Sequence, residues 1–203
     1  SEGNERDADT AVKAARAALD GKWAGISPGD RARLMLKAAD LMESKLDEFV
    51  QLETANCGKT LFESKVEIRL SIDVLRYYAG WATKFSGETL PSGPGAFLFT
   101  LREPVGVVAA ITPWNFPLLL SMWKYGPALA TGNTIVHKPA SLTPMTALKF
   151  AEVIQAAGFP EGVFNVVPGP GSTVGSALVA HPGVDKIAFT GDSSTGKGIM
   201  KQC

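Results

Sequence analysis

The sequence predicts an α/β protein built on a doubly wound parallel sheet, preceded by a helical leader and an extended arm. From residue 105 onwards, four short apolar runs alternate with longer amphipathic segments, the pattern of parallel strands joined by crossover helices. Before residue 87, helical periodicity dominates. The chain has 203 residues, 45% hydrophobic content and zero formal net charge, which indicates a globular protein with one sizeable core or two small ones.

Charge and cysteine content argue against several classes of partner and site. Lys and Arg are dispersed among Asp and Glu, so no nucleic-acid partner is expected, and no apolar run is long enough to span a membrane. The first residues lack the apolar region of a signal peptide, and cytoplasmic residence is therefore expected. Cys57 and Cys203 lie far apart without a second cluster of metal ligands, which His137 and His181 do not supply. Neither a disulfide framework nor a metal site is predicted.

Residues 1–86 form the predicted helical leader, which is expected to pack on the domain that follows. Ser27 is the expected N-cap of the second helix, and Thr60 and Glu63 form the capping-box pattern that opens the third. The second helix carries regularly spaced apolar residues, among them Leu34, Leu41 and Phe49. Helices are predicted over residues 11–19, over residues 28–54 and from Thr60 towards Trp81.

Residues 87–104 form the predicted arm. Two segments with extended character, Gly87–Leu90 and Phe97–Leu101, flank the turn-forming stretch Pro91–Gly95. An exposed apolar edge at Phe97–Leu101 invites pairing with another chain. We therefore expect the arm to help build an oligomer, a homodimer or a homotetramer.

Residues 105–203 form the predicted α/β domain. Strands are predicted at residues 105–111, 134–138, 164–167 and 186–189, and helices at residues 118–130, 144–157 and 172–180. Right-handed crossovers would place helices on both faces of the sheet and bring all the strand carboxyl ends to one edge. Asn115, Lys138, Pro168 and Gly191 are then expected to share that edge, which is where doubly wound sheets hold a nucleotide.

The turn Ile111–Pro117 is a candidate active-site turn. Asn115 follows a buried strand, and Pro117 suits the first turn of a helix, so the Asn115 side chain is expected to project from the carboxyl end of the strand. A rigidly held amide there can donate a hydrogen bond to a developing oxyanion, an interaction worth about 3–4 kcal/mol. The alternative is that Asn115 caps the helix that follows.

Two glycine-rich turns are ambiguous. Gly191–Lys197 fits the opening of a phosphate-binding P-loop, but Gly198 stands where a Ser or Thr would ligate magnesium, so nucleotide triphosphate hydrolysis is not predicted. Backbone N–H groups at this strand-to-helix turn can still bind a pyrophosphate. The alternative for this turn, and for Pro168–Gly171, is a plain turn without a ligand.

Taken in order, five motifs resemble those of the aldehyde dehydrogenase superfamily. The resemblance covers nearly the whole chain and implies a Rossmann-like NAD(P)-binding domain in an oxidoreductase that converts an aldehyde to a carboxylic acid with NAD or NADP. The motifs are Thr112–Pro117, Gly126–Asn133, Lys138-Pro139, Ala157–Pro160 and Phe189–Gly191 with Gly196.

The resemblance also implies roles for single residues. Asn115 would help form the oxyanion hole for a thiohemiacetal, Lys138 would contact the adenosine ribose, and the turn Gly191–Gly196 would lie against the cofactor pyrophosphate. The implied cofactor-binding residues are Thr112, Trp114, Lys138, Ser141, Gly171, Gly191, Asp192 and Gly196. Phe116, Leu120 and Trp123 would line the substrate tunnel, although the same apolar positions also suit ordinary core.

The chain departs from the family pattern at two positions near the cofactor. Ser141 stands where many NAD-preferring relatives have a glutamate that grips the ribose hydroxyls, so no carboxylate would repel a 2'-phosphate. Dual or NADP-leaning specificity is therefore expected. Asp192 replaces a small hydroxyl residue after Gly191, and a carboxylate beside a pyrophosphate is unexpected. Asp192 is instead a candidate helix cap.

The resemblance further implies that the nucleophile and the general base lie beyond the turn Gly191–Gly196. Cys203 follows that turn too soon, and Cys57 lies in the helical leader, so both are interpreted as non-catalytic. The chain thus resembles a fragment of an aldehyde dehydrogenase that is inactive by itself. The alternatives are a dinucleotide-binding fragment without chemistry and a structural protein that reuses the fold.

Overall fold

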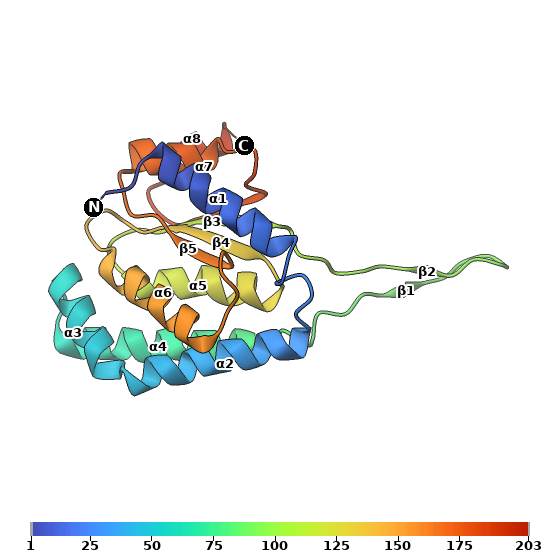
Figure 1. Cartoon of the computed structure of the whole chain (residues 1–203), viewed down its shortest axis with the longest axis horizontal. Coiled ribbons are helices and arrows are strands. Elements are labelled where there is room, and N and C mark those ends of the chain that lie inside the picture. Colours follow the sequence, from blue (N-terminus) through green and yellow to red (C-terminus); the bar gives the residue numbers. More distant parts are fainter. Residues whose placement is uncertain (1, 203) are drawn as a thin grey trace.

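A computed structural model describes residues 2–202 and contains a four-stranded parallel sheet between layers of helices (Figure 1). The strand order is β5-β4-β3-β6, and every neighbouring pair is parallel. The strands are β3 (Val107–Ile111), β4 (Thr134–Lys138), β5 (Phe164–Val166) and β6 (Lys186–Phe189). The predicted α/β class and parallel sheet are confirmed.

The two faces of the sheet follow from the alternation of side chains along β3. Val108 and Ala110 join the core cluster formed with the helices below the sheet in Figure 1, whereas Val107 and Ala109 join the cluster above it. All five residues of β3 and of β4 are buried. Strand β3 is a continuous run of apolar residues, as expected when both faces of a parallel sheet are covered, whereas β4 ends in the buried polar residues His137 and Lys138.

One face carries two layers of helices. The helices α5 (Pro117–Ala130) and α6 (Met145–Ala157) lie nearest the sheet, and α2 (Pro28–Ser44) and α4 (Leu61–Ala79) lie outside them (Figure 1). At the α4–α5 crossing, a Cβ built at Gly126 would lie 2.4 Å from the ring of Tyr78. A glycine is therefore required for these two helices to approach so closely.

The opposite face is covered by α1 (Glu5–Leu19) together with α7 (Ser176–Val179). Ala8, Val12 and Ala15 of α1 are buried against this face. The helical leader is thus divided between the two sides of the sheet, with α1 on one side and α2–α4 on the other. Its helices share their cores with the strands.

Several predicted helix starts are confirmed. The Ser27 hydroxyl accepts a hydrogen bond from the Asp30 N–H, and Thr60 and Glu63 form the reciprocal capping box at the start of α4. The first helix begins earlier than predicted, at Glu5, because Asn4 and Asp7 form a second capping box.

The prediction of one helix over residues 28–54 is wrong. Helix α2 ends at Ser44, and a separate helix, α3 (Leu46–Cys57), begins after Lys45, whose φ of −112° and ψ of 21° break the helical geometry. Neither Gly nor Pro marks this break, and the apolar spacing continues across it to Phe49 and Val50. The break allows α3 to pack against α4 and α6. Local apolar periodicity does not indicate this packing.

The predicted helix over residues 172–180 is correct in outline but not in its first turn. Residues Gly171–Gly175 form a wider π-helical turn, in which the Gly175 N–H donates to the carbonyl of Pro170, before α7 begins at Ser176. Glycines at both ends of this turn ease its departure from α-helical geometry. After β6, the helix α8 spans Ser193–Met200.

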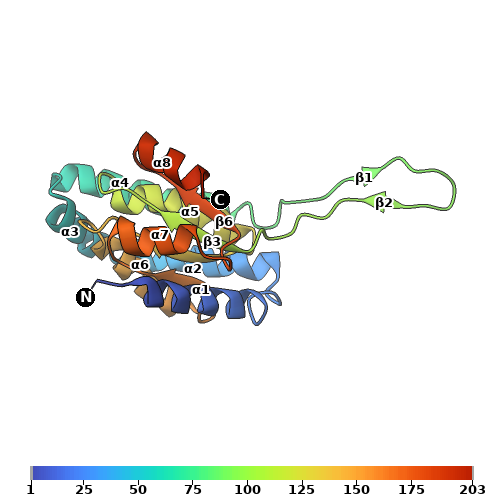
Figure 2. The ribbon, with the colours of Figure 1, turned by 90° about the horizontal axis from the view of Figure 1, so that it is seen from above.

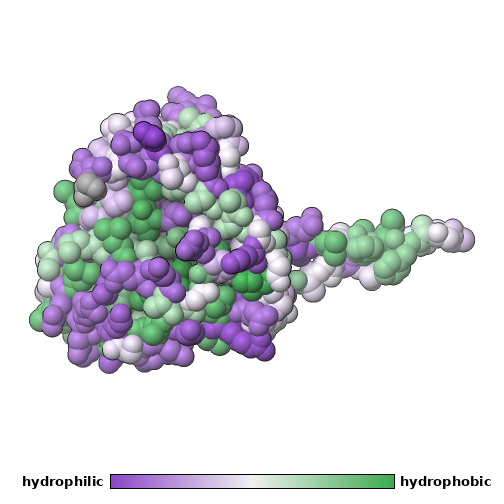
Figure 3. Space-filling model, viewed as in Figure 1, coloured by the Kyte–Doolittle hydropathy of each residue, from purple (hydrophilic) through white to green (hydrophobic). Residues whose placement is uncertain are grey.

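The arm extends away from the body of the molecule as a two-stranded antiparallel ribbon (Figure 2). Its strands are β1 (Thr89–Leu90) and β2 (Leu98–Phe99), and the Ala96 N–H donates to Gly93 across a turn in which Gly95 has a φ of 87°. The predicted pair of extended segments joined by a turn is confirmed. Apolar residues colour much of its surface (Figure 3), with Phe97, Phe99 and Leu101 more than half exposed.

None of the helices among residues 2–202 combines the length and the apolar character needed to cross a bilayer.

Candidate functional site

The carboxyl ends of the strands meet at one edge, as predicted. Ile111 lies in register with Lys138 on one side and with Phe189 on the other. The Thr190 N–H donates to the Ile111 carbonyl at 3.0 Å, and the segment after β5 is joined to β4 by a 2.8 Å hydrogen bond from the Val167 N–H to the carbonyl of His137. The segments that contain Asn115, Lys138, Pro168 and Gly191 therefore leave the sheet at the same edge.

The β3–α5 turn presents Asn115 to solvent. Helix α5 begins at Pro117, its N-cap is Phe116, and no side chain makes a capping hydrogen bond there. The alternative that Asn115 caps this helix is therefore wrong. Asn115 is exposed, and the hydrogen bonds that hold this turn run to its backbone carbonyls. The side-chain amide is thus positioned to donate to a ligand at the edge of the sheet.

The base of this turn is held by the buried side chain of His137. The Nε2 atom of His137 lies 2.9 Å from the hydroxyl of Thr112, and Nδ1 is hydrogen-bonded to the hydroxyl of Tyr125. Burial, followed by the charges of Lys138 and Lys124, lowers the pKa of His137 well below its ordinary value. The imidazole is therefore neutral, and it links β3, β4 and α5 beneath the turn.

The outer side of the turn is held by the loop between α3 and α4. The thiol of Cys57 donates to the Trp114 carbonyl at 3.3 Å, and the ammonium of Lys59 donates to the Asn115 carbonyl at 2.8 Å. The same ammonium lies 4.8 Å from the centre of the Phe116 ring. The α3–α4 loop and the turn are 56 to 58 positions apart in the sequence.

Sequence reasoning missed His137 and Lys59 as determinants of this site. His137 sits within a strand and has no local partner, whereas Lys59 gains its contacts with the turn only when the leader packs against α5. The Gly58-Lys59 pair after a helix signals a turn but not its destination. Burial raises the pKa of the Cys57 thiol, which agrees with a non-catalytic cysteine. Cys203 lies outside the described residues.

One face of α5 carries the residues assigned to the substrate tunnel. Phe116 is 39% exposed and Trp123 is 55% exposed, while Leu120 between them is half-buried. Phe116 and Trp123 are therefore not part of a core cluster among residues 2–202. The neighbouring Lys124 donates to the Thr190 hydroxyl at 2.6 Å, and burial lowers its pKa to about 8.

A pocket of about 240 Å³ opens at the same edge of the sheet, on the side of α7 and α8. The Lys138 side chain is buried beside it, donates to the Pro139 carbonyl at 2.7 Å and has a pKa lowered by burial. A Cβ built at Gly171 would meet no atom within 4 Å, so this backbone is open to a neighbour. The lining includes Ile111, Lys138, Gly171, Gly175, Phe189 and Thr195.

The start of α8 does not present a free anion site. Asp192 is the N-cap of α8, and its carboxylate accepts a 2.8 Å hydrogen bond from the Ser194 N–H, which confirms the interpretation of Asp192 as a cap. Hydrogen bonds from Ser194 lower the pKa of Asp192, so this carboxylate is ionised at neutral pH. A Cβ built at Gly191 would lie 2.6 Å from the Phe189 ring, so packing alone requires a glycine there.

The structure therefore divides the cofactor-binding residues expected from sequence into groups. Lys138 and Gly171 line the pocket, and Gly191, Asp192 and Gly196 lie at the start of α8.

The remaining expected residues differ in exposure. The exposed Ser141 donates to the Gly169 carbonyl at 2.9 Å. Trp114 is exposed on the α5 side of the edge, whereas Thr112 is buried with its hydroxyl committed to His137. The backbone of Thr112 is therefore the part of this residue that remains to contact a cofactor.

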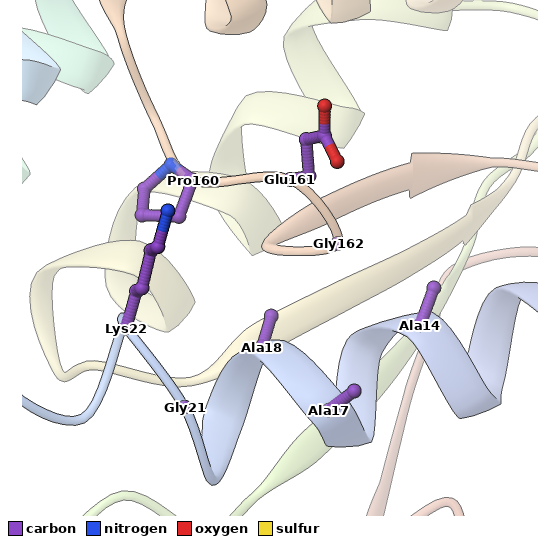
Figure 4. A pocket seen from close by; sticks show the side chains of 8 residues that line it. All are labelled: Ala14, Ala17, Ala18, Gly21, Lys22, Pro160, Glu161 and Gly162. Carbon is purple, nitrogen blue, oxygen red and sulfur yellow. The ribbon is translucent and has the colours of Figure 1, made fainter.

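Another pocket, of about 650 Å³, lies at the opposite edge of the sheet (Figure 4). Three alanines of α1 form its floor, and Lys22 and the loop Pro160–Gly162, which precedes β5, lie around it. The charged residues of this lining are Lys22 and Glu161, and none of the residues expected from sequence to form a site lies here. Among residues 2–202, no group of three or more His, Cys, Asp or Glu side chains is placed to hold a metal ion.

Comparisons with known proteins agree on one family. The model of the aldehyde dehydrogenase family matches residues 1–203. The DhaS protein of Bacillus subtilis is 55% identical over 201 residues, and the mitochondrial aldehyde dehydrogenase of Rattus norvegicus is 50% identical over 202 residues. Each alignment covers 98% of this chain, but 41% and 39% of the respective relatives. The chain thus spans about 40% of the length of these relatives.

A solved structure gives the same answer. The NAD+ complex of aldehyde dehydrogenase from Bacillus cereus superposes on this chain with a TM-score of 0.97 at 49% identity. The match covers 99% of this chain and 41% of that chain.

The neutral state of His137 predicts a pH dependence of stability. Because its pKa is lowered by folding, the unfolded chain binds a proton at this imidazole below about pH 6.5 that the folded protein does not bind. The free energy of unfolding should fall as the pH decreases below about 6.5, with this group contributing up to about 1.4 kcal/mol per pH unit. Urea denaturation at several pH values between about 5 and about 8 measures this slope.

The matched control is the half-buried His181, which pairs with Asp9 on the far side of the sheet. A His137→Gln variant should lose much of the slope, whereas His181→Gln should keep it. An unchanged slope in His137→Gln would contradict the assignment.

Proposed function

The chain belongs to the aldehyde dehydrogenase family, and from this we propose that the protein oxidises an aldehyde to a carboxylic acid with NAD or NADP. The observation that carries this proposal is the fixed β3–α5 turn, which exposes Asn115 at the edge where parallel sheets bind ligands. The nicotinamide cofactor supplies a hydride acceptor when bound. The contributions of the chain itself are binding, orientation and stabilisation of charge.

Asn115 is proposed to stabilise the oxygen of the aldehyde as a thiol adds to the carbonyl carbon and a thiohemiacetal forms. The oxygen gains negative charge in this step, and an amide N–H held in place donates to it without reorganisation. The proximity of the N-terminus of α5 adds a favourable dipole. Phe116, Leu120 and Trp123 extend from this turn along one face of α5 and offer an apolar wall to the organic part of the substrate.

The attacking thiol is proposed to come from a cysteine other than Cys57. The thiol of Cys57 donates to the backbone of Trp114, and burial raises its pKa, so the nucleophilic thiolate is disfavoured. Among residues 2–202, no other cysteine is present. The general base is likewise not assigned to any described residue.

The pocket beside Lys138 fits one end of a dinucleotide. Typical ligand pockets enclose about 300–1,000 Å³, so the 240 Å³ found here suits a part of the cofactor such as the adenosine. Gly171 allows close approach of a ligand, and the buried ammonium of Lys138 offers a donor to ribose hydroxyls. The ionised Asp192 at the start of α8 disfavours a pyrophosphate directly against that helix end.

An Asn115→Ala substitution tests the proposed chemistry. Loss of one oxyanion donor should lower kcat about 10²–10³-fold, while the affinity for NAD or NADP stays near that of the unmodified protein. Steady-state kinetics with an aldehyde panel, together with cofactor titration by fluorescence, measure both quantities. An unchanged kcat would refute the role of Asn115, and absence of aldehyde-dependent reduction in the unmodified full-length protein would refute the activity.

A Ser141→Glu substitution tests the proposed dual or NADP-leaning specificity. A carboxylate about 4 Å from the 2'-phosphate would cost about 1–4 kcal/mol, so the ratio of kcat/KM for NADP to that for NAD should fall about fivefold or more. Ser141→Gln adds similar bulk without charge and should change this ratio far less. Efficient use of NAD with rejection of NADP by the unmodified protein would contradict the proposal.

The arm is proposed to hold a homodimer or homotetramer together. Phe97 and Phe99 pack against each other with ring centres 5.7 Å apart yet remain more than half exposed. Sedimentation velocity at micromolar concentration should show an oligomer that dissociates in the Phe97→Ser/Phe99→Ser variant. Leu142→Ser, at an exposed residue outside the arm, should leave it intact. A monomeric unmodified protein would contradict this proposal.

A further inference from the structure

The loop between α3 and α4 is anchored at both ends. Helix α3 ends at Cys57 with Gly58 in the left-handed conformation, at a φ of 83°. Helix α4 begins at Leu61, and Thr60 and Glu63 form its capping box. Lys59 therefore lies on a short segment between two packed helices. The ends of these helices define its backbone position independently of the contacts that its side chain makes.

The side chain of Lys59 is 11% exposed and lies among two buried carboxylates and the active-site turn. Its ammonium donates to Glu67 and to the Asn115 carbonyl, and it lies 3.9 Å from a carboxylate oxygen of Glu53. Two of its three N–H donors are thus committed, one to an acidic side chain and one to the backbone of the turn. An ammonium so enclosed has few alternative positions.

The buried acids determine the direction in which the ammonium points. Glu53 is 1% exposed, and neither of its carboxylate oxygens has a hydrogen-bond partner among the described residues. Burial raises the pKa of Glu53, and at 3.9 Å its carboxylate is the more distant of the two acids from the ammonium. Glu67, which is in direct contact, is the principal partner of Lys59.

The contacts from this loop reach two successive carbonyls of the turn. The Cys57 thiol donates to Trp114, and the Lys59 ammonium donates to Asn115. Fixing both carbonyls fixes the peptide planes on either side of the Asn115 Cα atom, and with them the direction of its Cα–Cβ bond, from which the amide extends. The adjacent Phe116 ring, which lies under the same ammonium, is fixed as well.

We propose that Lys59, oriented by Glu67, is a positioning residue that sets the direction of the Asn115 amide towards the substrate oxygen. This inference rests on the proposed role of Asn115. Lys59 does not touch the substrate; it acts through the backbone of the turn. The helical leader accordingly contributes to catalysis through a specific contact in addition to its packing.

A double-mutant cycle on the full-length protein tests the proposal. Lys59→Met keeps the length of the side chain without its charge. This substitution should lower kcat at least about tenfold, as expected when an interaction made only in the transition state is lost. The KM for the cofactor should stay within about twofold of that of the unmodified protein. In an Asn115→Ala background the same substitution should change kcat less than about threefold, because no amide remains to be positioned. Lys65→Met, at an exposed lysine of α4, is the matched control and should leave kcat unchanged.

Hydrogen–deuterium exchange provides a readout independent of activity. Peptides that span residues 112–120 should exchange faster in Lys59→Met than in the unmodified protein or in Lys65→Met. Lys59→Met leaves the carboxylate of Glu67 without its direct partner. If for that reason this variant does not fold into the native structure, the double variant Lys59→Met/Glu67→Gln is used in both measurements, because it leaves no unpaired carboxylate at position 67.

The outcomes separate the two proposals. Equal losses of kcat for Lys59→Met in both backgrounds, or unchanged exchange over residues 112–120, would overturn the positioning role. An Asn115→Ala variant with normal kcat would instead refute the proposed role of Asn115, and the exchange measurement would still report whether Lys59 fixes the turn.

Discussion

The attachment of the β3–α5 turn on two sides is the constraint on which the candidate site depends. From beneath, the neutral imidazole of His137 joins Thr112 to Tyr125 and so ties the end of β3 to α5. From outside, Lys59 and Cys57 hold the carbonyls of the turn. A surface loop without these contacts would sample many conformations, and an amide that must stabilise a transient charge requires a single one.

This arrangement explains why the helical leader is inseparable from the sheet. The helices α3 and α4 supply the loop that reaches the turn, and α4 crosses α5 closely enough that Gly126 has no room for a side chain. On the opposite face, α1 covers the apolar side chains of β3 and β4. Removal of the leader would uncover the face of the sheet that α1 covers, expose the outer sides of α5 and α6, and release the turn at the same time.

The two sides of the carboxyl edge differ in electrostatic character. On the α5 side, Lys59 is paired with Glu67, and Asn115 is exposed between Trp114 and Phe116. On the α8 side, the buried Lys138 lies near glycines, and Asp192 occupies the helix N-terminus. In the proposed function, carbonyl chemistry belongs to the first side and binding of a dinucleotide to the second, with strand β3 between them.

The sequence by itself determined the alternation of strands and helices, the capped starts of α2 and α4, the turn of the arm and the edge at which Asn115 and Lys138 emerge. These features follow from periodicity and capping, which are local. The tertiary structure alone decided the break at Lys45, the π-helical turn at Gly171–Gly175 and the roles of His137 and Lys59. Each of these last features depends on packing or contacts between segments far apart in the chain, and the energy of such contacts has no signature in local residue order.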